Sequence, residues 1–309
     1  MNASAPAKVI LLGEHAVVYE QPAIAVPVSS LRAHAAAAAA PAGSGLTVIA
    51  RDLNQTLPIN VDSAVVENAL ALAARLALRE LNLPAPDMTI TVTSDIPLAS
   101  GLGSGAAVSA ALMRALAEAL GASLPNERLN ELVYEVEKLH HGWPSGIDNT
   151  VIVYEQPILY QRNRPIETIR IGAPFHLLIG DTGKGALTRI AVGDVRKLVQ
   201  QAPNRYQPVI DSIGQLVREA RRAIEAGDAQ ALGPLLIQNH ALLQTLTVSS
   251  PELDCLVDAA LSAGALGAKL SGGGRGGNMI ALVTPSTARA VRQALMRAGA
   301  ARVFETTIA

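Results

Sequence analysis

Three glycine-bearing segments, spread over almost the whole chain, constrain this sequence more than any other feature. They lie at residues 7–15, 97–106 and 269–277, and the third reads Lys-Leu-Ser-Gly-Gly-Gly-Arg-Gly-Gly. Because glycine has no Cβ, backbone N–H groups in such segments can approach and wrap an anion closely. Three segments so far apart in the sequence indicate a fold that grips one large anionic ligand from several sides, and a nucleoside triphosphate fits that description.

The composition favours a globular protein with a large apolar core. The chain has 309 residues, of which 50% are hydrophobic and 17% charged, so disorder is not expected. Its formal net charge of −1 gives no electrostatic reason to bind nucleic acid or an anionic membrane. No apolar stretch approaches the roughly 18 residues of a membrane span. The single cysteine, Cys255, excludes an internal disulfide. We therefore expect a soluble, cytoplasmic protein.

Hydrophobic periodicity predicts a strand-rich first half and a helix-rich second half. Strands are expected at residues 8–13, 23–28, 31–38, 46–50, 88–94, 147–154 and 158–161, and helices at 63–81, 106–120 and 126–139. After a strand at 175–180, we expect helices at 186–201, 206–226, 228–246, 251–263 and 286–298, a strand–loop–strand unit at 267–283 and a last strand at 301–308. The change near residues 165–175 predicts two domains, 1–170 and 171–309.

The segment at residues 97–106 is typical of a phosphate-binding loop. It precedes a predicted helix, whose first N–H groups and positive dipole end attract phosphate, and Ser104 adds a hydroxyl for phosphate or Mg²⁺. The segment also satisfies the G-x-G-x-x-A dinucleotide pattern, but residues 106–139 read as two helices and not as a short βαβ unit. A structural turn stays an alternative, and the Walker A pattern is absent.

Residues 137–149 contain a candidate general base. Asp148 follows a Pro-Ser-Gly turn and is expected to open a strand, where its carboxylate could take a proton from a substrate hydroxyl. A capping or turn aspartate is the alternative. His140 and His141 are adjacent, so they do not face one site, and a zinc site is not expected.

The first glycine-bearing segment has charged residues at both ends of a predicted strand. Lys8 precedes Val-Ile-Leu-Leu and is the only Lys or Arg among the first 30 residues, while Glu14 and His15 follow the strand. The chain has five lysines and twenty arginines, and four of the lysines (Lys8, Lys138, Lys184 and Lys269) lie in or beside segments that stand out for other reasons. A lysine ammonium is not interchangeable with a guanidinium at a phosphate. A solvent-facing Lys8 and a chance distribution of lysines are the alternatives.

Taken together, these segments resemble the GHMP kinases. The resemblance rests on residues 5–19, 97–107, 142–149, 181–188 and 267–277, and it extends in order and spacing over essentially the whole chain. It implies an α+β fold, with an N-terminal half like ribosomal protein S5 domain 2 and a ferredoxin-like C-terminal half with added helices. Within the family, the first segment is most similar to the branch that uses ATP to phosphorylate the primary (5-) hydroxyl of mevalonate, an early step of isoprenoid biosynthesis.

The resemblance also implies a role for each candidate residue, and a homodimer. Asp148 would be the general base, and Lys8 would stabilise the alkoxide and the developing phosphate charge. Mg²⁺ would be held by Glu137 with Ser104. The remaining residues fall into three groups: Glu14, His15 and Thr188 on the substrate side; Pro97, Ser100, Gly101, Leu102, Gly103, Ser104, Gly105 and Ala106 around the ATP phosphates; and Ser271, Gly272 and Gly273, which would complete the site.

Two positions depart from the family pattern. Gly105 stands where the family has a second serine that ligates Mg²⁺. Either Ser104 or water would take that place, or the affinity for the metal would be weaker. Arg275 stands where the family usually has a small residue. It would either reach a phosphate or point to solvent, and we favour solvent.

Other functions stay open at this point. A phosphomevalonate kinase would need extra basic residues for the substrate phosphate, and a homoserine kinase would need groups for an α-amino acid. A diphosphomevalonate decarboxylase shares the fold, but its Ser-Ala-x-Arg-Ser signature is absent. A catalytically silent ligand sensor belongs to a different class, and the presence of both Asp148 and Lys8 argues against it.

Overall fold

The structure, a computed structural model, describes residues 1–60, 68–98, 100–141, 144–185 and 188–309. These residues gather into two units that interleave along the chain. Unit 1 comprises residues 1–7, 31–97 and 103–155, and unit 2 comprises residues 8–30, 98–102 and 156–309. Strands β1 (Asn2–Leu12) and β2 (Ala23–Ala39) contribute to both units. The predicted boundary at residue 170 stays a prediction.

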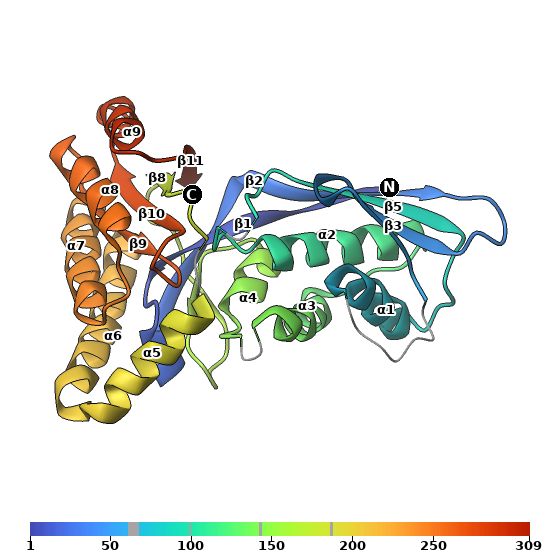
Figure 1. The fold of residues 1–309 in the computed structure, drawn as a ribbon, viewed down its shortest axis with the longest axis horizontal. Coiled ribbons are helices and arrows are strands. Elements are labelled where there is room, and N and C mark those ends of the chain that lie inside the picture. Colours follow the sequence, from blue (N-terminus) through green and yellow to red (C-terminus); the bar gives the residue numbers. More distant parts are fainter. Residues whose placement is uncertain (61–67, 99, 142–143, 186–187) are drawn as a thin grey trace. The chain divides into compact units, whose positions relative to one another are not determined.

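Unit 1 is a sheet with helices packed on it (Figure 1). The second part of β2 pairs antiparallel with β5 (Met88–Ser94), which lies parallel to β3 (Leu46–Ala50), and β4 (Gln55–Pro58) forms the edge after the short helix η2 (Arg51–Leu53). Met88, Ile90 and Val92 alternate with less buried threonines, as expected for a half-buried strand. The helices are α1 (Ala69–Leu81), α2 (Ser104–Ala119), α3 (Asn126–His141) and α4 (Ile147–Tyr154).

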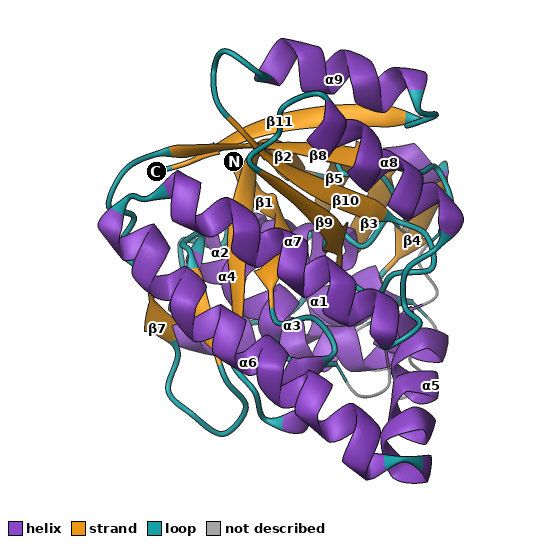
Figure 2. Ribbon diagram, turned by 90° about the vertical axis from the view of Figure 1, so that its left-hand side faces the viewer, coloured by secondary structure: helices purple, strands orange, loops and turns teal. Residues whose placement is uncertain are grey.

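Unit 2 contains a four-stranded antiparallel sheet in the order β11-β8-β10-β9. Helices α8 and α9 pack against each other and against this sheet, while α6 and α7 lie side by side (Figure 2). The first part of β2 pairs with β6, which pairs with β7. The bounds are η1 (Ala16–Tyr19), β6 (Ile158–Tyr160), β7 (Glu167–Thr168), β8 (Phe175–Asp181), α5 (Thr188–Gln201), α6 (Pro203–Ala226), α7 (Ala229–Thr245), α8 (Pro251–Ser262), β9 (Gly267–Ser271), β10 (Asn278–Val283), α9 (Ala288–Arg297) and β11 (Arg302–Ile308).

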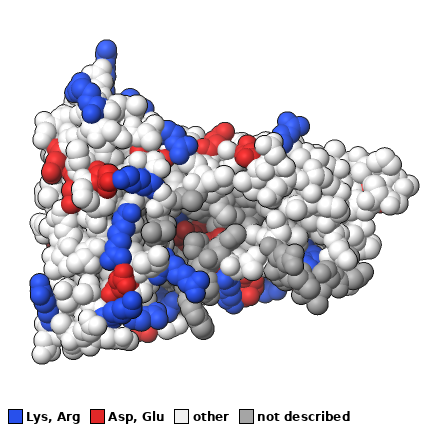
Figure 3. Space-filling view, in the orientation of Figure 1, with Lys and Arg blue, Asp and Glu red and all other residues white. Residues whose placement is uncertain are grey.

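The charged surface agrees with the small net charge. On the face shown in Figure 3, basic and acidic side chains lie intermingled among uncharged ones. None of the helices in the described ranges is long and apolar enough to cross a lipid bilayer.

Most of the expected elements are confirmed, with ends shifted by a few residues. The strand at 88–94 has the predicted bounds, and the two strands expected at 23–28 and 31–38 are one continuous strand, β2. Helix α1 begins after Asn68, whose side chain caps it by accepting from Leu70 N–H at 2.8 Å. The first residues expected for this helix, 63–67, lie outside the described residues. The same is true of residues 186–187, the first expected for the helix at 186–201.

The strand expected at 147–154 is wrong, because these residues form helix α4. Its sequence is rich in β-branched residues and six of its eight residues are buried, so it lacks the polar face that reveals a helix. The helix begins directly after Gly146, whose φ of 93° turns the chain. Thr150 Oγ1 donates to Gly146 O at 2.6 Å. Asp148 therefore lies in the first turn of a helix and does not open a strand.

Candidate active site

One row of residues crosses the four-stranded sheet of unit 2 where the chain enters the third glycine-bearing segment. Ser271 faces Asn278, Asn278 faces Asp181, and Asp181 faces Arg302. Asp181 is buried, and its Oδ2 accepts from Arg302 at 2.7 and 3.1 Å while its Oδ1 accepts from Gly183 N–H at 2.8 Å. This carboxylate therefore holds the turn that follows β8, and its bonds within the protein give it a structural role.

The glycines of the third segment bring its backbone against neighbouring elements. A Cβ on Gly273 would lie 2.5 Å from Thr188 Oγ1 and 2.8 Å from Thr188 Cα, at the start of α5. A Cβ on Gly274, which has φ +75°, would lie 1.9 Å from Val248 O. Side chains at these two positions would clash with Thr188 and Val248, and glycine avoids both clashes.

A buried ion pair joins the first and third glycine-bearing segments. Lys269 on β9 is fully buried, and its Nζ donates to Glu14 Oε1 and to Leu270 O. Burial lowers the pKa of Lys269, whereas the Glu14 carboxylate opposes that shift. Glu14 is also buried, and its Oε2 has no hydrogen-bond partner among the described residues. Sequence reasoning named Glu14 but assigned no role to Lys269, although a lysine between apolar residues of a strand was a signal.

His15 lies beside this ion pair and is neutral at pH 7. Its Nε2 is 3.1 Å from Gly273 O, and since a carbonyl only accepts, Nε2 carries the proton and Nδ1 is the acceptor. Burial lowers the pKa of His15 from its usual 6.5 to about 4. Nδ1 is buried and finds no partner in the described part of the chain. Glu14 Oε2 and His15 Nδ1 are thus two buried acceptors suited to hydroxyl donors of a ligand.

The lowered pKa of His15 predicts a pH-dependent stability. The unfolded chain binds the proton near pH 6.5 and the folded chain only near pH 4, so stability falls as the pH drops through this window. We expect the wild type to lose about 2 kcal/mol more between pH 7 and pH 5 than His15→Gln, which retains a donor for Gly273 O. Urea unfolding at both pH values measures this difference. His34→Gln, at a half-exposed position, is the control and should lose as much stability as the wild type. A wild type that loses no more than His15→Gln would contradict the prediction.

Further hydrogen bonds join the three segments within unit 2. The buried Lys8 donates its backbone N–H to Leu102 O at 3.0 Å, and Asn278 Nδ2 donates to Ser100 O at 2.5 Å. Ser271 Oγ donates to Ile10 O at 2.9 Å. Leu102 is therefore bound to β1 and Ser100 to the start of β10, so the three segments lie together as the binding of one large ligand would require. Ala99, inside the predicted phosphate loop, lies outside the described residues.

Unit 1 contains the predicted phosphate-binding helix end. Helix α2 begins at Ser104, and Gly103 precedes it with φ 78°. The structure gives no side-chain cap for this end within the described residues, and Gly105 is exposed there. The first N–H groups of α2, including those of Gly105 and Ala106, have no acceptor within the helix, and such groups bind phosphate.

The candidate base and the candidate metal ligand also lie in unit 1. Asp148 is half-buried in the first turn of α4, and Ile147 N–H donates to Ser145 Oγ at 3.3 Å just before it. Glu137 lies on α3, is 3% exposed, and belongs to a helix that contacts α4. Gly142 and Trp143, which are part of the predicted segment, lie outside the described residues.

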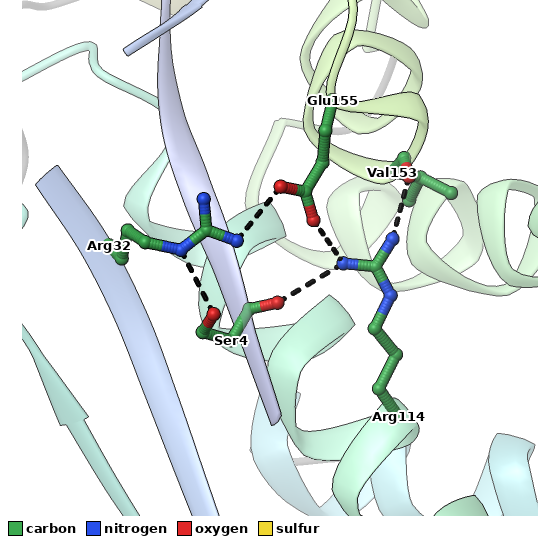
Figure 4. A network of polar contacts seen from close by, with 5 residues as sticks. All are labelled: Ser4, Arg32, Arg114, Val153 and Glu155. Atoms are coloured by element: carbon green, nitrogen blue, oxygen red, sulfur yellow. Dashed lines mark hydrogen bonds and ion pairs between the residues drawn. The ribbon is translucent and has the colours of Figure 1, made fainter. Parts of the chain in front are cut away.

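A network of two arginines fixes the far end of α4 (Figure 4). Arg114 of α2 donates to Val153 O at 2.6 Å and to Glu155 Oε1 at 2.8 Å, while Arg32 of β2 donates to Glu155 Oε2 at 2.8 Å. Arg32 and Arg114 also contact Ser4 of β1. Because α4 has only eight residues, holding its C-terminal end also holds the turn that carries Asp148.

Removing Arg114 is expected to lower stability and activity together. Arg114→Ala leaves Val153 O and one oxygen of the partly buried Glu155 without this donor, so we expect unfolding to become easier by about 1–3 kcal/mol. The measurement is urea unfolding together with turnover at saturating substrate. Arg128→Ala, which removes exposed pairs with Glu80 and Glu131, is the control and should have less effect on both. An Arg114 variant as active and stable as this control would refute the network's role.

The fold and these segments identify the class of protein. Residues 65–156 match the family model of the GHMP kinases N terminal domain, and residues 220–301 match that of the GHMP kinases C terminal. The chain belongs to the GHMP kinase family. The predicted family resemblance and the mixed α+β fold class, with its N- and C-terminal kinase halves, are therefore confirmed.

Several relatives within this family are mevalonate kinases. That of Thermococcus sibiricus is 37% identical over 314 residues, which cover 96% of this chain and 93% of the relative. That of Pyrococcus horikoshii is 37% identical over 317 residues, covering 96% and 92%. The crystal structure of the L. major mevalonate kinase in complex with R-mevalonate has a TM-score of 0.86 and 31% identity, covering 100% of this chain and 95% of that one.

Proposed function

We propose that this chain is a mevalonate kinase, which transfers the γ-phosphoryl group of ATP to the primary (5-) hydroxyl of mevalonate in isoprenoid biosynthesis. The observation that carries the proposal is the pair of buried acceptors, Glu14 Oε2 and His15 Nδ1, beside a glycine-rich loop. Mevalonate carries hydroxyl donors, and a neutral His15 can accept from one of them. The 37% identity to named mevalonate kinases over nearly the whole chain supports the same substrate.

In the proposed reaction, Asp148 takes the proton of the mevalonate hydroxyl while the oxygen of that hydroxyl bonds to the γ-phosphorus of ATP. The bond from the γ-phosphorus to the bridging oxygen breaks, and ADP leaves. Lys8 stabilises the negative charge that develops on the transferred group. Phosphoryl transfer needs mainly positioning and charge neutralisation, so one base, one ammonium and aimed backbone N–H groups suffice from the protein.

We assign the remaining candidate residues by chemistry. Thr188 completes the substrate side, because it packs against Gly273, whose carbonyl holds His15. The ATP phosphates bind to backbone N–H groups of two segments. The first segment comprises Pro97, Ser100, Gly101, Leu102, Gly103, Ser104, Gly105 and Ala106, and the second comprises Ser271, Gly272 and Gly273. Pro97 has no N–H and shapes the turn.

Mg²⁺ is the metal that we propose for this reaction. Glu137 offers a carboxylate and Ser104 a hydroxyl, and these are oxygen donors of the kind that Mg²⁺ prefers. No group of three or more His, Cys, Asp or Glu side chains that could hold a metal occurs among the described residues. A site with few protein ligands fits Mg²⁺, which usually keeps substrate phosphates and water in its coordination shell. When bound, Mg²⁺ neutralises charge on the phosphates.

Three further expectations belong to the same proposal. The enzyme acts in the cytoplasm, as the composition indicated, and forms a homodimer, as the family resemblance implied. We place its domain boundary near residue 170, since the two matched family models end and begin on either side of it.

Product analysis tests the proposed function. The purified chain is incubated with Mg²⁺-ATP and R-mevalonate and followed by phosphorus NMR. We expect one phosphomonoester signal, coupled to the CH₂ protons of carbon 5, for each ADP formed. Formation of ADP with inorganic phosphate alone would reject a mevalonate kinase. No reaction despite ATP binding would also reject it and would favour a silent sensor.

A further inference from the structure

Arg275 is the single non-glycine residue of the loop formed by residues 272–277. Its φ of 56° lies in the left-handed region, which costs a residue with a Cβ some free energy. Glycine would adopt this conformation without strain, as its neighbours in the loop do. An arginine at this position therefore needs compensating contacts from its side chain.

The arginine side chain makes such contacts on two sides. Its Nη1 donates to Asp194 Oδ2 on α5 at 2.6 Å, and its Nε donates to Thr247 O at 3.2 Å. Its backbone N–H donates to Val248 O at 2.8 Å. The Arg275 guanidinium is the main reason that the pKa of Asp194 is lowered, so the ion pair persists at neutral pH. The expectation that Arg275 points to solvent is therefore wrong.

These contacts hold the loop where it touches the substrate side of unit 2. Gly273, two residues before Arg275, accepts from His15 Nε2 and lies against Thr188 at the start of α5. Asp194 lies on that same helix, so the ion pair joins the loop to the element that carries Thr188. Movement of the loop would displace the carbonyl that fixes the tautomer and orientation of His15.

We propose that Arg275 is a positioning residue, which clamps the glycine loop to α5 through Asp194 and thereby sets the affinity for mevalonate. The inference rests on the proposed function, because it needs mevalonate as the ligand of Glu14 and His15. Arg275 acts through the loop and does not contact ATP. Its effect therefore falls on the KM for mevalonate, while kcat stays nearly unchanged. Because Gly272 and Gly273 are also assigned to the ATP phosphates, any change in the KM for ATP should be the same in Arg275 and Asp194 variants.

The test compares Arg275→Gly, Asp194→Ala, the double variant and Arg275→Lys. Glycine relieves the backbone strain, so Arg275→Gly is expected to fold with wild-type stability. We expect the KM for mevalonate to rise about fivefold in each single variant, as for a partly exposed ion pair. The double variant should be no worse than either one, because both lose the same contact. Arg275→Lys should recover part of the loss.

The control is Lys197→Ala, which removes the other, exposed partner of Asp194 and should match the wild type.

Three results would overturn the inference. A wild-type KM for mevalonate in Arg275→Gly would show that the clamp is unimportant. A raised KM for ATP in Arg275→Gly but not in Asp194→Ala would show that the arginine contacts phosphate instead. Hydrogen exchange of the loop amides gives a readout without substrate, and it should become faster in both single variants; unchanged exchange would also refute the clamp. Failure of the wild type itself to phosphorylate mevalonate would reject the proposed function, and the exchange data would still decide whether the clamp exists.

Discussion

Replacing Asp148 by asparagine is expected to lower kcat by about 10²–10⁴-fold, the usual contribution of a positioned general base. Asparagine has the same shape but cannot take a proton from the mevalonate hydroxyl. Asp148 lies in the first turn of α4, where an amide is also tolerated, so the variant should unfold at the same urea concentration as the wild type. The KM values should change little, because the loss arises after both substrates have bound.

The measurement is steady-state turnover of Asp148→Asn over a range of mevalonate and ATP concentrations. Glu118→Gln is the matched control, because it also removes a carboxylate of unit 1, from an exposed position on α2. This control should retain full activity. Turnover of Asp148→Asn within a few-fold of the wild type would remove Asp148 from the mechanism.

Replacing Lys269 by methionine is expected to have the largest effect on stability. The ion pair between Lys269 and Glu14 has side chains that are 0% and 1% exposed. Removing the ammonium leaves Glu14 as a buried charge without its counterion, which costs about 3–5 kcal/mol. The carboxylate would then take up a proton or the site would open, and Glu14 would no longer present Oε2 to a ligand.

A double variant separates the loss of stability from the loss of function. Lys269→Met combined with Glu14→Gln removes both charges, so we expect most of the lost stability to return. Mevalonate binding should remain weak, because the carboxylate acceptor is missing. Urea unfolding and the KM for mevalonate provide the two readouts, with Lys197→Met as the exposed control. A loss below about 1 kcal/mol in Lys269→Met would contradict the importance of this ion pair.

The elements with a regular apolar pattern and the buried strands of unit 2 were predictable from the sequence, whereas the buried helix α4 was not. Strand β5 alternates threonine with apolar residues, and its bounds were predicted correctly. Helix α4 is buried on nearly all sides and rich in β-branched residues, so local propensity favours a strand and only packing makes it a helix. For this reason, Asp148 was predicted to open a strand, whereas it lies in the first turn of a helix.

The positions of the candidate site residues were predictable only where glycines mark close approaches of the backbone. The glycines at 272–274 predicted a backbone that approaches an anion closely. In the structure, Gly273 and Gly274 lie against Thr188 and Val248, and the contact with an anion stays a prediction. The long-range partners carried no local signal. The sequence separates Lys269 from Glu14 by 255 positions and Arg275 from Asp194 by 81, and neither pair forms a recognisable motif.

The most direct test of the central claim measures ADP release by the purified chain with Mg²⁺-ATP and four acceptors in parallel: mevalonate, phosphomevalonate, homoserine and galactose. We predict that kcat/KM for mevalonate exceeds each of the others by at least about 10³-fold. Phosphomevalonate would bring an extra phosphate to Glu14 and His15, homoserine an α-amino group, and galactose a bulky sugar ring. Equal or faster turnover of any other acceptor would contradict the assignment.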